Sequence, residues 1–485
     1  MLFNSIDFAI FLPIVFILYW FVANKNLKLQ NLLIVAASYY FYACWDWRFL
    51  SLILISTIVD YFVGLKLSNQ DNDNKRKILL WISIVVNLGF LGFFKYYNFF
   101  LDNFINTFSF FGTEINANSL NIILPVGISF YTFQTLSYTI DVYKRKLEPT
   151  KDFIAFSAFV SFFPQLVAGP IERAKNLLAQ FDKKRKFEYD LAVDGMRQIL
   201  WGLFKKVVIA DNCAVYANEI FNNYSDYSGS TLLLGAIFFA FQIYGDFSGY
   251  SDIAIGTSRL FGFNLKRNFA FPYFSRDIAE FWRRWHISLS SWFRDYVYIP
   301  LGGSRSGTMK NLRNILIIFT VSGFWHGANW TFIIWGVLNA LYFMPLMIMK
   351  KNRLNRDTVA EGKYFPSIRE FFQMGNTFFL TLTAWIFFRS ETVGDAISYI
   401  SGIFSGSIFS FPEVFVARSP LSGPLVVIFI IIFVLTEWLQ REKQHALQFE
   451  NKDLSRLIRW SIYYGVAMAI ILFGGNQQQF IYFQF

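Results

Sequence analysis

The stretch Val321-Ser-Gly-Phe-Trp-His-Gly-Ala-Asn-Trp330 joins two apolar runs, Asn314–Gly327 and Trp330–Met349. Runs of this kind favour transmembrane helices, so the stretch predicts a helical membrane protein. His326 places an ionisable group inside an apolar span, where such groups are costly and are usually functional. The alternative is a neutral, hydrogen-bonded histidine that only packs. We take His326 as the first candidate site residue.

Composition supports a polytopic, all-α membrane protein with a single domain over residues 1–485. Of the 485 residues, 55% are hydrophobic and 21% aromatic. A soluble domain would not carry so many long apolar runs. Cys44 and Cys213 provide neither a disulfide framework nor the spacing of metal ligands, so we expect no metal. Basic cytoplasmic loops explain the net charge of +11 better than nucleic-acid binding does.

Basic segments alternate with segments that contain no Lys or Arg, and this asymmetry predicts the topology. Lys75–Lys77 and Lys183–Lys186 are cytoplasmic in this scheme, and the tail after Phe473 is outside, as is the N-terminus. The first run has no cleavage signal and is interpreted as a retained span. We expect about 12 spans, within a range of roughly 11–13. They are Ile6–Val22, Asn31–Cys44, Arg48–Leu67, Ile78–Phe100, Asn121–Val142, Arg197–Tyr216, Thr231–Phe247, Asn314–Gly327, Trp330–Met349, Phe371–Arg389, Pro424–Gln440 and Arg459–Gly475.

Two regions do not read as simple spans. Phe153–Pro170 contains Pro164, Gly169 and Pro170, which interrupt a helix. Non-helical backbone at membrane depth must be buried in protein or line a wet cavity, so we expect a re-entrant segment there. Gly249–Arg313 is too rich in charge to span.

Ser275–Tyr298 contains the second candidate, His286. Ser275 or Asp277 is a suitable N-cap, and apolar residues from Ile278 to Trp292 recur at helical spacing. The segment predicts a partly immersed helix that presents arginines and His286 to an anionic ligand, since guanidinium groups bind phosphate well. An interfacial helix anchored in lipid head groups is equally compatible. The candidate donor-binding arginines are Arg283, Arg284 and Arg294.

These blocks resemble the membrane-bound O-acyltransferase family, in its bacterial alginate O-acetylation branch. The resemblance is densest over residues 121–349 and is carried by an ordered set of motifs: Leu124–Phe133, Phe163–Glu172, Asp246–Asp252, Phe281–Ser290, Tyr298–Gly303 and Phe324–Trp330. It implies a ring of tilted helices around a funnel, with re-entrant and interfacial helices. It also implies two characteristic histidines, which match His286 and His326. Relatives often have a histidine where this chain has Asn339, so a role for that side chain is in doubt.

The mechanism implied by this resemblance needs a general base, donors for an oxyanion and exclusion of water, but no covalent nucleophile. We predict His326 as the base, and His286 on the donor side, where it positions the acyl carrier or assists proton transfer. Asn329 and Trp330 follow His326 at helical spacing, so either N–H is placed to orient the ring or the carbonyl. Trp325 is included with the substrate-binding residues.

Two aspartates and the C-terminal tail complete the set of unusual features. Asp246 and Asp252 are acidic residues next to apolar sequence, and nearby arginines favour structural ion pairs for both. The uncharged tail ends in Phe-Ile-Tyr482-Phe-Gln-Phe485. It predicts either an aromatic anchor at the membrane surface or a folded-back segment whose Tyr482 accepts the acyl group and relays it to a separate transferase.

The leading hypothesis is therefore an O-acyltransferase of the bacterial inner membrane that supplies acetyl groups for an extracytoplasmic polysaccharide such as alginate. The co-substrate is an acyl thioester, either acetyl-CoA or an acidic acyl carrier protein, and we expect no bound cofactor. Expected partners are membrane lipid and an extracytoplasmic acetyltransferase. Peptidoglycan O-acylation or D-alanyl transfer is the related alternative. A transporter or channel is the alternative from a different class.

Overall fold

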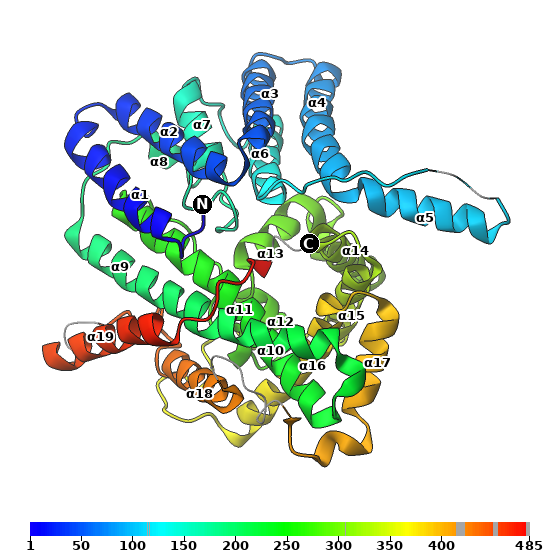
Figure 1. Cartoon of the computed structure of the whole chain (residues 1–485). Coiled ribbons are helices and arrows are strands. Elements are labelled where there is room, and N and C mark those ends of the chain that lie inside the picture. Colours follow the sequence, from blue (N-terminus) through cyan, green and yellow to red (C-terminus); the bar gives the residue numbers. More distant parts are fainter. Residues whose placement is uncertain (114, 116, 306, 414–421, 450–453, 482–485) are drawn as a thin grey trace. The chain divides into compact units, whose positions relative to one another are not determined.

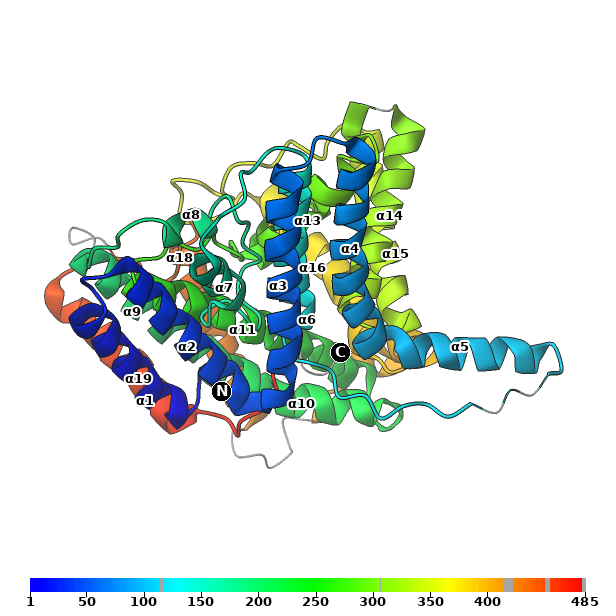
Figure 2. The ribbon, with the colours of Figure 1, turned by 90° about the horizontal axis from the view of Figure 1, so that it is seen from above.

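The computed structural model describes residues 1–113, 115, 117–305, 307–413, 422–449 and 454–481, and these contain helices but no strand. The chain divides into two compact units, residues 1–189 with 258–265, and residues 190–257 with 266–485. Figures 1 and 2 show the helices of each unit. Of the described stretches, six are long and apolar enough to cross a membrane: Leu27–Ser68, Asp73–Phe110, Gly229–Leu260, Trp330–Ile348, Ile368–Arg389 and Arg456–Phe473.

The first unit is a set of packed helices with one deeply buried polar cluster. The helices are α1 (Ile6–Ile17), α2 (Leu27–Asp46), α3 (Leu50–Ser68), α4 (Asp73–Leu91), α5 (Tyr97–Phe110), α6 (Ile128–Tyr143), α7 (Phe153–Ser161) and α8 (Leu178–Phe181). Helices α3, α4 and α6 lie side by side (Figure 2). Asp60 on α3 accepts hydrogen bonds from Asn87 on α4 and Thr139 on α6, each at 2.8 Å. These bonds satisfy the buried carboxylate and fix the three helices to one another.

The second unit contains the segments around both candidate histidines. Its helices are α9 (Tyr189–Leu203), α10 (Asp211–Asn222), α11 (Gly229–Leu260), α12 (Ile278–Arg284), α13 (Ile287–Phe293), α14 (Thr308–His326), α15 (Trp330–Ile348), α16 (Ile368–Arg389), α17 (Val393–Ile403), α18 (Gly423–Leu439) and α19 (Arg456–Phe473). Shorter 3-10 or π-helical segments occur in both units. Those of the first unit are η1 (Leu18–Val22), η2 (Trp47–Phe49) and η3 (Gly92–Tyr96). Those of the second unit are η4 (Phe204–Ala210), η5 (Tyr224–Asp226), η6 (Pro272–Phe274), η7 (Arg294–Tyr298), η8 (Gly303–Arg305) and η9 (Gly406–Phe409).

The predicted spans all fall on helices, with two corrections. Residues 121–127 are not helical, because Pro125 and the left-handed Gly127, at φ +75°, precede α6. Helix α11 continues beyond Phe247 to Leu260, so the non-spanning segment begins later than Gly249. The number of spans, and the ring around a funnel, stay predictions.

The interrupted segment after α7 agrees with its sequence. Helix α7 ends at Ser161, and residues 162–170 form turns that are buried throughout. Their backbone is covered by protein, which is the condition for non-helical chain within an apolar environment. Close packing also explains Gly169, where an added Cβ would overlap the Gln165 backbone.

Candidate active site

His286 lies at a break between α12 and α13. Asp277 caps α12 as predicted, because its carboxylate accepts the backbone N–H of Glu280 at 2.7 Å. Trp285 is then extended, and His286 has the left-handed conformation, at φ +42°. The prediction of one helix through Ser275–Tyr298 is therefore wrong. A buried, non-glycine residue in this conformation is strained, and such strain is concentrated at functional sites.

The apolar residues that were assigned to one helical face are buried despite this break. Trp285 is 1% exposed and Trp292 is 6% exposed. The complete set is Ile278, Phe281, Trp282, Trp285, Leu289 and Trp292. Because these tryptophans pack inside the protein, the alternative of an interfacial helix anchored in lipid is not supported.

Asn268 fixes the tautomer of His286. The Asn268 Oδ1 atom accepts the Ser288 backbone N–H at 3.2 Å and the Ser288 hydroxyl at 2.9 Å, so this atom is the carbonyl oxygen. The same oxygen lies 3.1 Å from His286 Nδ1. An oxygen that can only accept requires Nδ1 to donate, which leaves the Nε2 lone pair as the acceptor of a neutral imidazole.

Burial keeps this imidazole neutral. His286 is 1% exposed and lies outside the candidate spans. Desolvation of the charged form lowers the pKa of His286 to about 3, compared with an ordinary value of 6.5. The ring of Phe247 on α11 lies edge-on at a centroid distance of 4.6 Å. At physiological pH, His286 is therefore neutral and can accept a hydrogen bond at Nε2.

His326 is the last residue of α14, at the tight turn into α15. Added Cβ atoms at Gly323 and Gly327 would overlap Phe332, so these glycines permit the close approach of the two helices. His326 is 4% exposed and is surrounded by aromatic rings. Their centroid distances from its imidazole are 4.9 Å for Trp325, 5.1 Å for Trp335 and 5.5 Å for Phe388.

Asn329 and Trp330 do not follow His326 on the same helix, which corrects the argument from helical spacing. Gly327 is extended after α14, and Asn329 is the N-cap of α15, where it accepts the Thr331 backbone N–H at 3.1 Å. The amide of Asn329 donates to the Glu391 carbonyl at 2.8 Å. Trp330 is 53% exposed. The roles predicted for both side chains stay predictions.

Trp325 lies between the two histidines. Its ring centroid is 6.3 Å from that of His286 and 4.9 Å from that of His326. The structure therefore brings the two predicted catalytic histidines to one aromatic cluster, although they are 40 positions apart in the sequence. Both imidazoles are shielded from water, with exposed fractions of 1% for His286 and 4% for His326.

Asn339 is a packing residue with both amide ends bonded. Its Oδ1 accepts the indole N–H of Trp282 at 3.2 Å, and its Nδ2 donates to the Trp335 carbonyl at 2.8 Å. These bonds connect α12 with α15. Through Trp335, Asn339 supports one of the rings that contact His326.

Two of the predicted arginines line a cavity in the second unit, whose lining includes chain neighbours of the two histidines but neither imidazole. This cavity of about 520 Å³ is lined by Arg283 and Arg294, by Ile287, which follows His286, and by Ser322, which precedes His326 by one turn. Its lining is mostly apolar and also includes guanidinium groups. A cavity with this lining suits an acyl thioester whose carrier is anionic.

The three predicted arginines have different surroundings. Arg284 forms an ion pair with Glu280 at 2.8 Å, which stabilises α12. Arg283 donates to the carbonyl oxygens of Asn352, at 2.9 Å, and Asn355. Arg294 is exposed and pairs with Asp295 at 2.7 Å. Arg283 and Arg294 line the cavity and remain candidates for donor binding, whereas Arg284 is not among its lining residues.

The sequence analysis missed several residues of this site. Arg353 and Arg356, in the loop of residues 349–367, line the same cavity. A neighbouring cavity of about 490 Å³ shares Arg353 and adds Lys350. The dense basic run from Lys350 to Arg356 is the feature of the sequence that marks this loop. Asn268 gave no signal, because its contact with His286 depends on the fold.

Lysines, rather than the expected arginines, pair with the two aspartates of α11. Lys205 lies 2.5 Å from Asp252, and Lys206 lies 2.9 Å from Asp246 and 2.7 Å from Asp211. The expected structural ion pairs are thus present with a different cation. Tyr482, the predicted acyl relay, lies outside the described residues.

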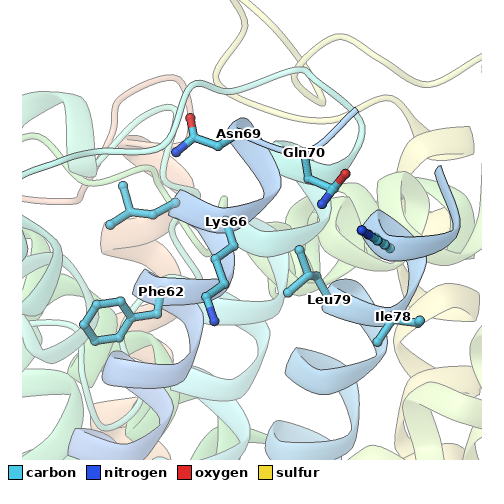
Figure 3. Close-up of a pocket in the computed structure, with 8 residues that line it drawn as sticks. Phe62, Lys66, Asn69, Gln70, Ile78 and Leu79 are labelled. Atoms are coloured by element: carbon cyan, nitrogen blue, oxygen red, sulfur yellow. The ribbon is translucent and has the colours of Figure 1, made fainter. Parts of the chain in front are cut away.

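A separate cavity of about 450 Å³ lies in the first unit, between α3 and α4 (Figure 3). Phe62 and Lys66 from α3 and Ile78 and Leu79 from α4 form its sides, and Gln70 lies at the connecting turn. It contains none of the predicted site residues, so we do not assign it to the acyl-transfer site.

Comparison with known proteins gives a matching family model and several relatives. The family model described as "MBOAT, membrane-bound O-acyltransferase family" matches residues 145–383. A relative from Pseudomonas putida, named "Probable alginate O-acetylase AlgI", is 36% identical over 100% of both chains. A "Peptidoglycan O-acetyltransferase" of Helicobacter pylori is 33% identical over 100% of this chain and 98% of its own. A "Teichoic acid D-alanyltransferase" of Streptococcus thermophilus is 30% identical over 49% of this chain and 60% of its own.

Proposed function

Because this chain belongs to the membrane-bound O-acyltransferase family, and is thus a multi-pass membrane enzyme that transfers acyl groups to oxygen, we propose that it moves acetyl groups across the bacterial inner membrane. The donor is a cytoplasmic thioester, and the acetyl group serves O-acetylation of an extracytoplasmic polysaccharide such as alginate. The family assignment excludes the transporter or channel alternative. In the proposed orientation, both termini are extracytoplasmic.

The arrangement of His286, Trp325 and His326 is the observation that carries this proposal. In the proposed step, His326 takes the proton of an acceptor hydroxyl while the oxygen of that hydroxyl attacks the thioester carbonyl. The C–S bond then breaks, and the thiolate takes up the proton from the imidazolium. His286 faces the donor, and its Nε2 accepts a hydrogen bond from the carrier's amide arm. The rings around both imidazoles keep water away from the thioester.

The donor occupies the cavity lined by Arg283, Arg294, Arg353 and Arg356. Guanidinium groups in its lining bind phosphate, which acetyl-CoA and the prosthetic arm of an acyl carrier protein both have. The apolar wall receives the thioester end. No cofactor other than this co-substrate is required, because a thioester is already activated for acyl transfer.

The acceptor hydroxyl is proposed to be that of Tyr482 in the C-terminal tail. Acetyl transfer to this phenol forms an ester that remains activated, so a separate extracytoplasmic acetyltransferase can transfer the group to a sugar hydroxyl and regenerate the phenol. Tyr482→Phe keeps the ring and removes only the oxygen. Continued acetylation of the polysaccharide by this variant would contradict the relay.

An acetyl group is favoured over D-alanyl because the acetyl-transferring relatives match the whole chain, whereas the D-alanyltransferase matches about half of it. The test is to supply the purified membrane protein separately with acetyl-CoA, an acetylated carrier protein and a D-alanylated carrier protein, and to measure thiol release. The proposal predicts turnover of an acetyl donor in the wild type. Turnover of the D-alanyl donor alone would overturn it and support the alternative.

A further inference from the structure

The C-terminal segment that follows α19 folds back into the second unit. It runs from α19 alongside α11, where the red trace in Figure 1 ends. Phe480 is 3% exposed and Ile481 is fully buried, with 0% exposure. A surface anchor would present its aromatic residues to lipid. In the described part of the segment, residues 474–481, the backbone is irregular, residues 474–479 are exposed or half-buried, and the last two residues are buried. We call this part the tail.

Hydrogen bonds to the backbone hold the start of the tail. The side-chain amide of Asn212 on α10 donates to the Phe473 carbonyl at 2.9 Å. The Gly475 N–H donates to the Val207 carbonyl at 3.1 Å. A Cβ at Gly474 would lie 2.9 Å from the Val207 side chain, so glycine at this position allows the close approach.

A buried ion cluster holds the end of the tail. Lys206 lies between Asp211, at 2.7 Å, and Asp246, at 2.9 Å. The second oxygen of Asp246 accepts the Ile481 N–H at 2.7 Å, and Lys206 also donates to the Gln478 carbonyl at 3.3 Å. The charges are paired with each other, and their remaining hydrogen-bonding capacity is directed to the tail backbone.

The same turns of α11 connect this cluster with the candidate active site. Asp246 immediately precedes Phe247, whose ring is 4.6 Å from that of His286. Tyr250, one turn further along α11, packs against Phe480 at a centroid distance of 5.3 Å. The tail is therefore docked on the helix that contacts His286.

We infer that Asn212, Lys206 and Asp246 form a clamp that seats the chain's own C-terminal segment beside His286, with Asp246 as a positioning residue for acyl transfer. This inference rests on the proposed function, in which the tail receives the acyl group. The clamp binds backbone groups and buries two apolar side chains. It thus accepts an uncharged segment with glycines at its start and apolar residues near its end.

Hydrogen exchange of the purified full-length protein tests the clamp. We expect the C-terminal peptide of Asp246→Asn to exchange roughly tenfold faster or more, because the Ile481 N–H loses a charge-assisted acceptor. Asp252→Asn is the matched control, since it changes a half-buried carboxylate that lies on the same helix as Asp246 but forms its ion pair with Lys205. Wild-type protection in Asp246→Asn, or equal acceleration in both variants, would overturn the clamp.

Kinetics of the same variants separate a positioning role from a structural one. The clamp predicts that Asp246→Asn lowers kcat for acetyl transfer without raising KM for the donor, and that Asp246→Glu restores part of kcat. An unchanged kcat in Asp246→Asn would overturn the positioning role. Tyr482→Phe distinguishes the two proposals: if it retains polysaccharide acetylation while Asp246→Asn still loosens the tail, the relay fails and the clamp stands.

Discussion

Asn268 sets the tautomer of His286, because its carbonyl oxygen accepts a hydrogen bond from Nδ1–H and leaves the acceptor lone pair on Nε2. The left-handed backbone at His286 places the ring toward this oxygen at the end of α12. A strained residue supported by a buried amide is typical of a site whose geometry is maintained for function rather than for stability.

The variant Asn268→Asp tests this assignment through the pH dependence of acetyl transfer. The pKa of His286 is lowered to about 3, so the imidazole is neutral above that pH and its titration does not limit the wild type between about pH 5 and 8. A carboxylate beside Nδ1 favours the imidazolium and raises this pKa. As the pH is lowered, we therefore expect Asn268→Asp to lose activity at a higher pH than the wild type does. Identical pH–rate profiles for the two proteins would contradict the assignment.

At the scale of elements, the hairpin of α14 and α15 depends on backbone-to-backbone packing. An added Cβ at Gly336 would overlap the Phe319 carbonyl oxygen. Trp335, the residue before it, contacts His326. Separation of these helices would therefore move an aromatic wall of the site.

We expect Gly336→Ala to destabilise the protein by about 1–3 kcal/mol, the range for overpacking, and to lower its unfolding temperature in detergent. Gly375→Ala on α16 is the control, because nothing lies within 4 Å of a Cβ there and alanine is a better helix former. Equal unfolding temperatures for the wild type and Gly336→Ala would show that the hairpin tolerates the extra methyl group.

The loop of residues 349–367 is fastened to α12 and provides Arg353 and Arg356 to the donor cavity. Arg276 pairs with Asp357 at 3.0 Å, and Asn355 donates to Asp277 at 2.7 Å. Hydrogen bonding to Arg276 lowers the pKa of Asp357. The ion pair between Arg276 and Asp357 is therefore fully formed above the usual pKa of aspartate and weakens only as the pH falls below that value.

Asp357→Asn should raise KM for the thioester donor roughly two- to fivefold with little change in kcat, as expected for a partly exposed ion pair. Steady-state kinetics with varied donor concentration measure this effect. Asp71→Asn, which alters an exposed pair with Arg145 in the first unit, is the control and should keep the wild-type KM. A normal KM in Asp357→Asn would mean that the loop is held without this pair.

At the scale of the whole molecule, apolar runs predicted the helices, because a chain buried in lipid or protein must satisfy its backbone hydrogen bonds internally over long stretches. The motifs also singled out His286 and His326, which the structure brings to one aromatic cluster. The break at Trp285 and His286 was not predictable, since apolar spacing continues through it from Phe281 to Trp292. Asn268 contacts His286 only through tertiary structure, and the same is true of the lysines that pair with Asp246 and Asp252.

The rate of thiol release from an acetyl thioester by purified wild type and His326→Ala tests the central claim most directly. The proposed mechanism makes His326 the general base in a water-excluded aromatic cluster, so we predict that the variant loses about 10²–10⁴-fold in rate. A His326→Ala protein that is folded and releases thiol at the wild-type rate would contradict it.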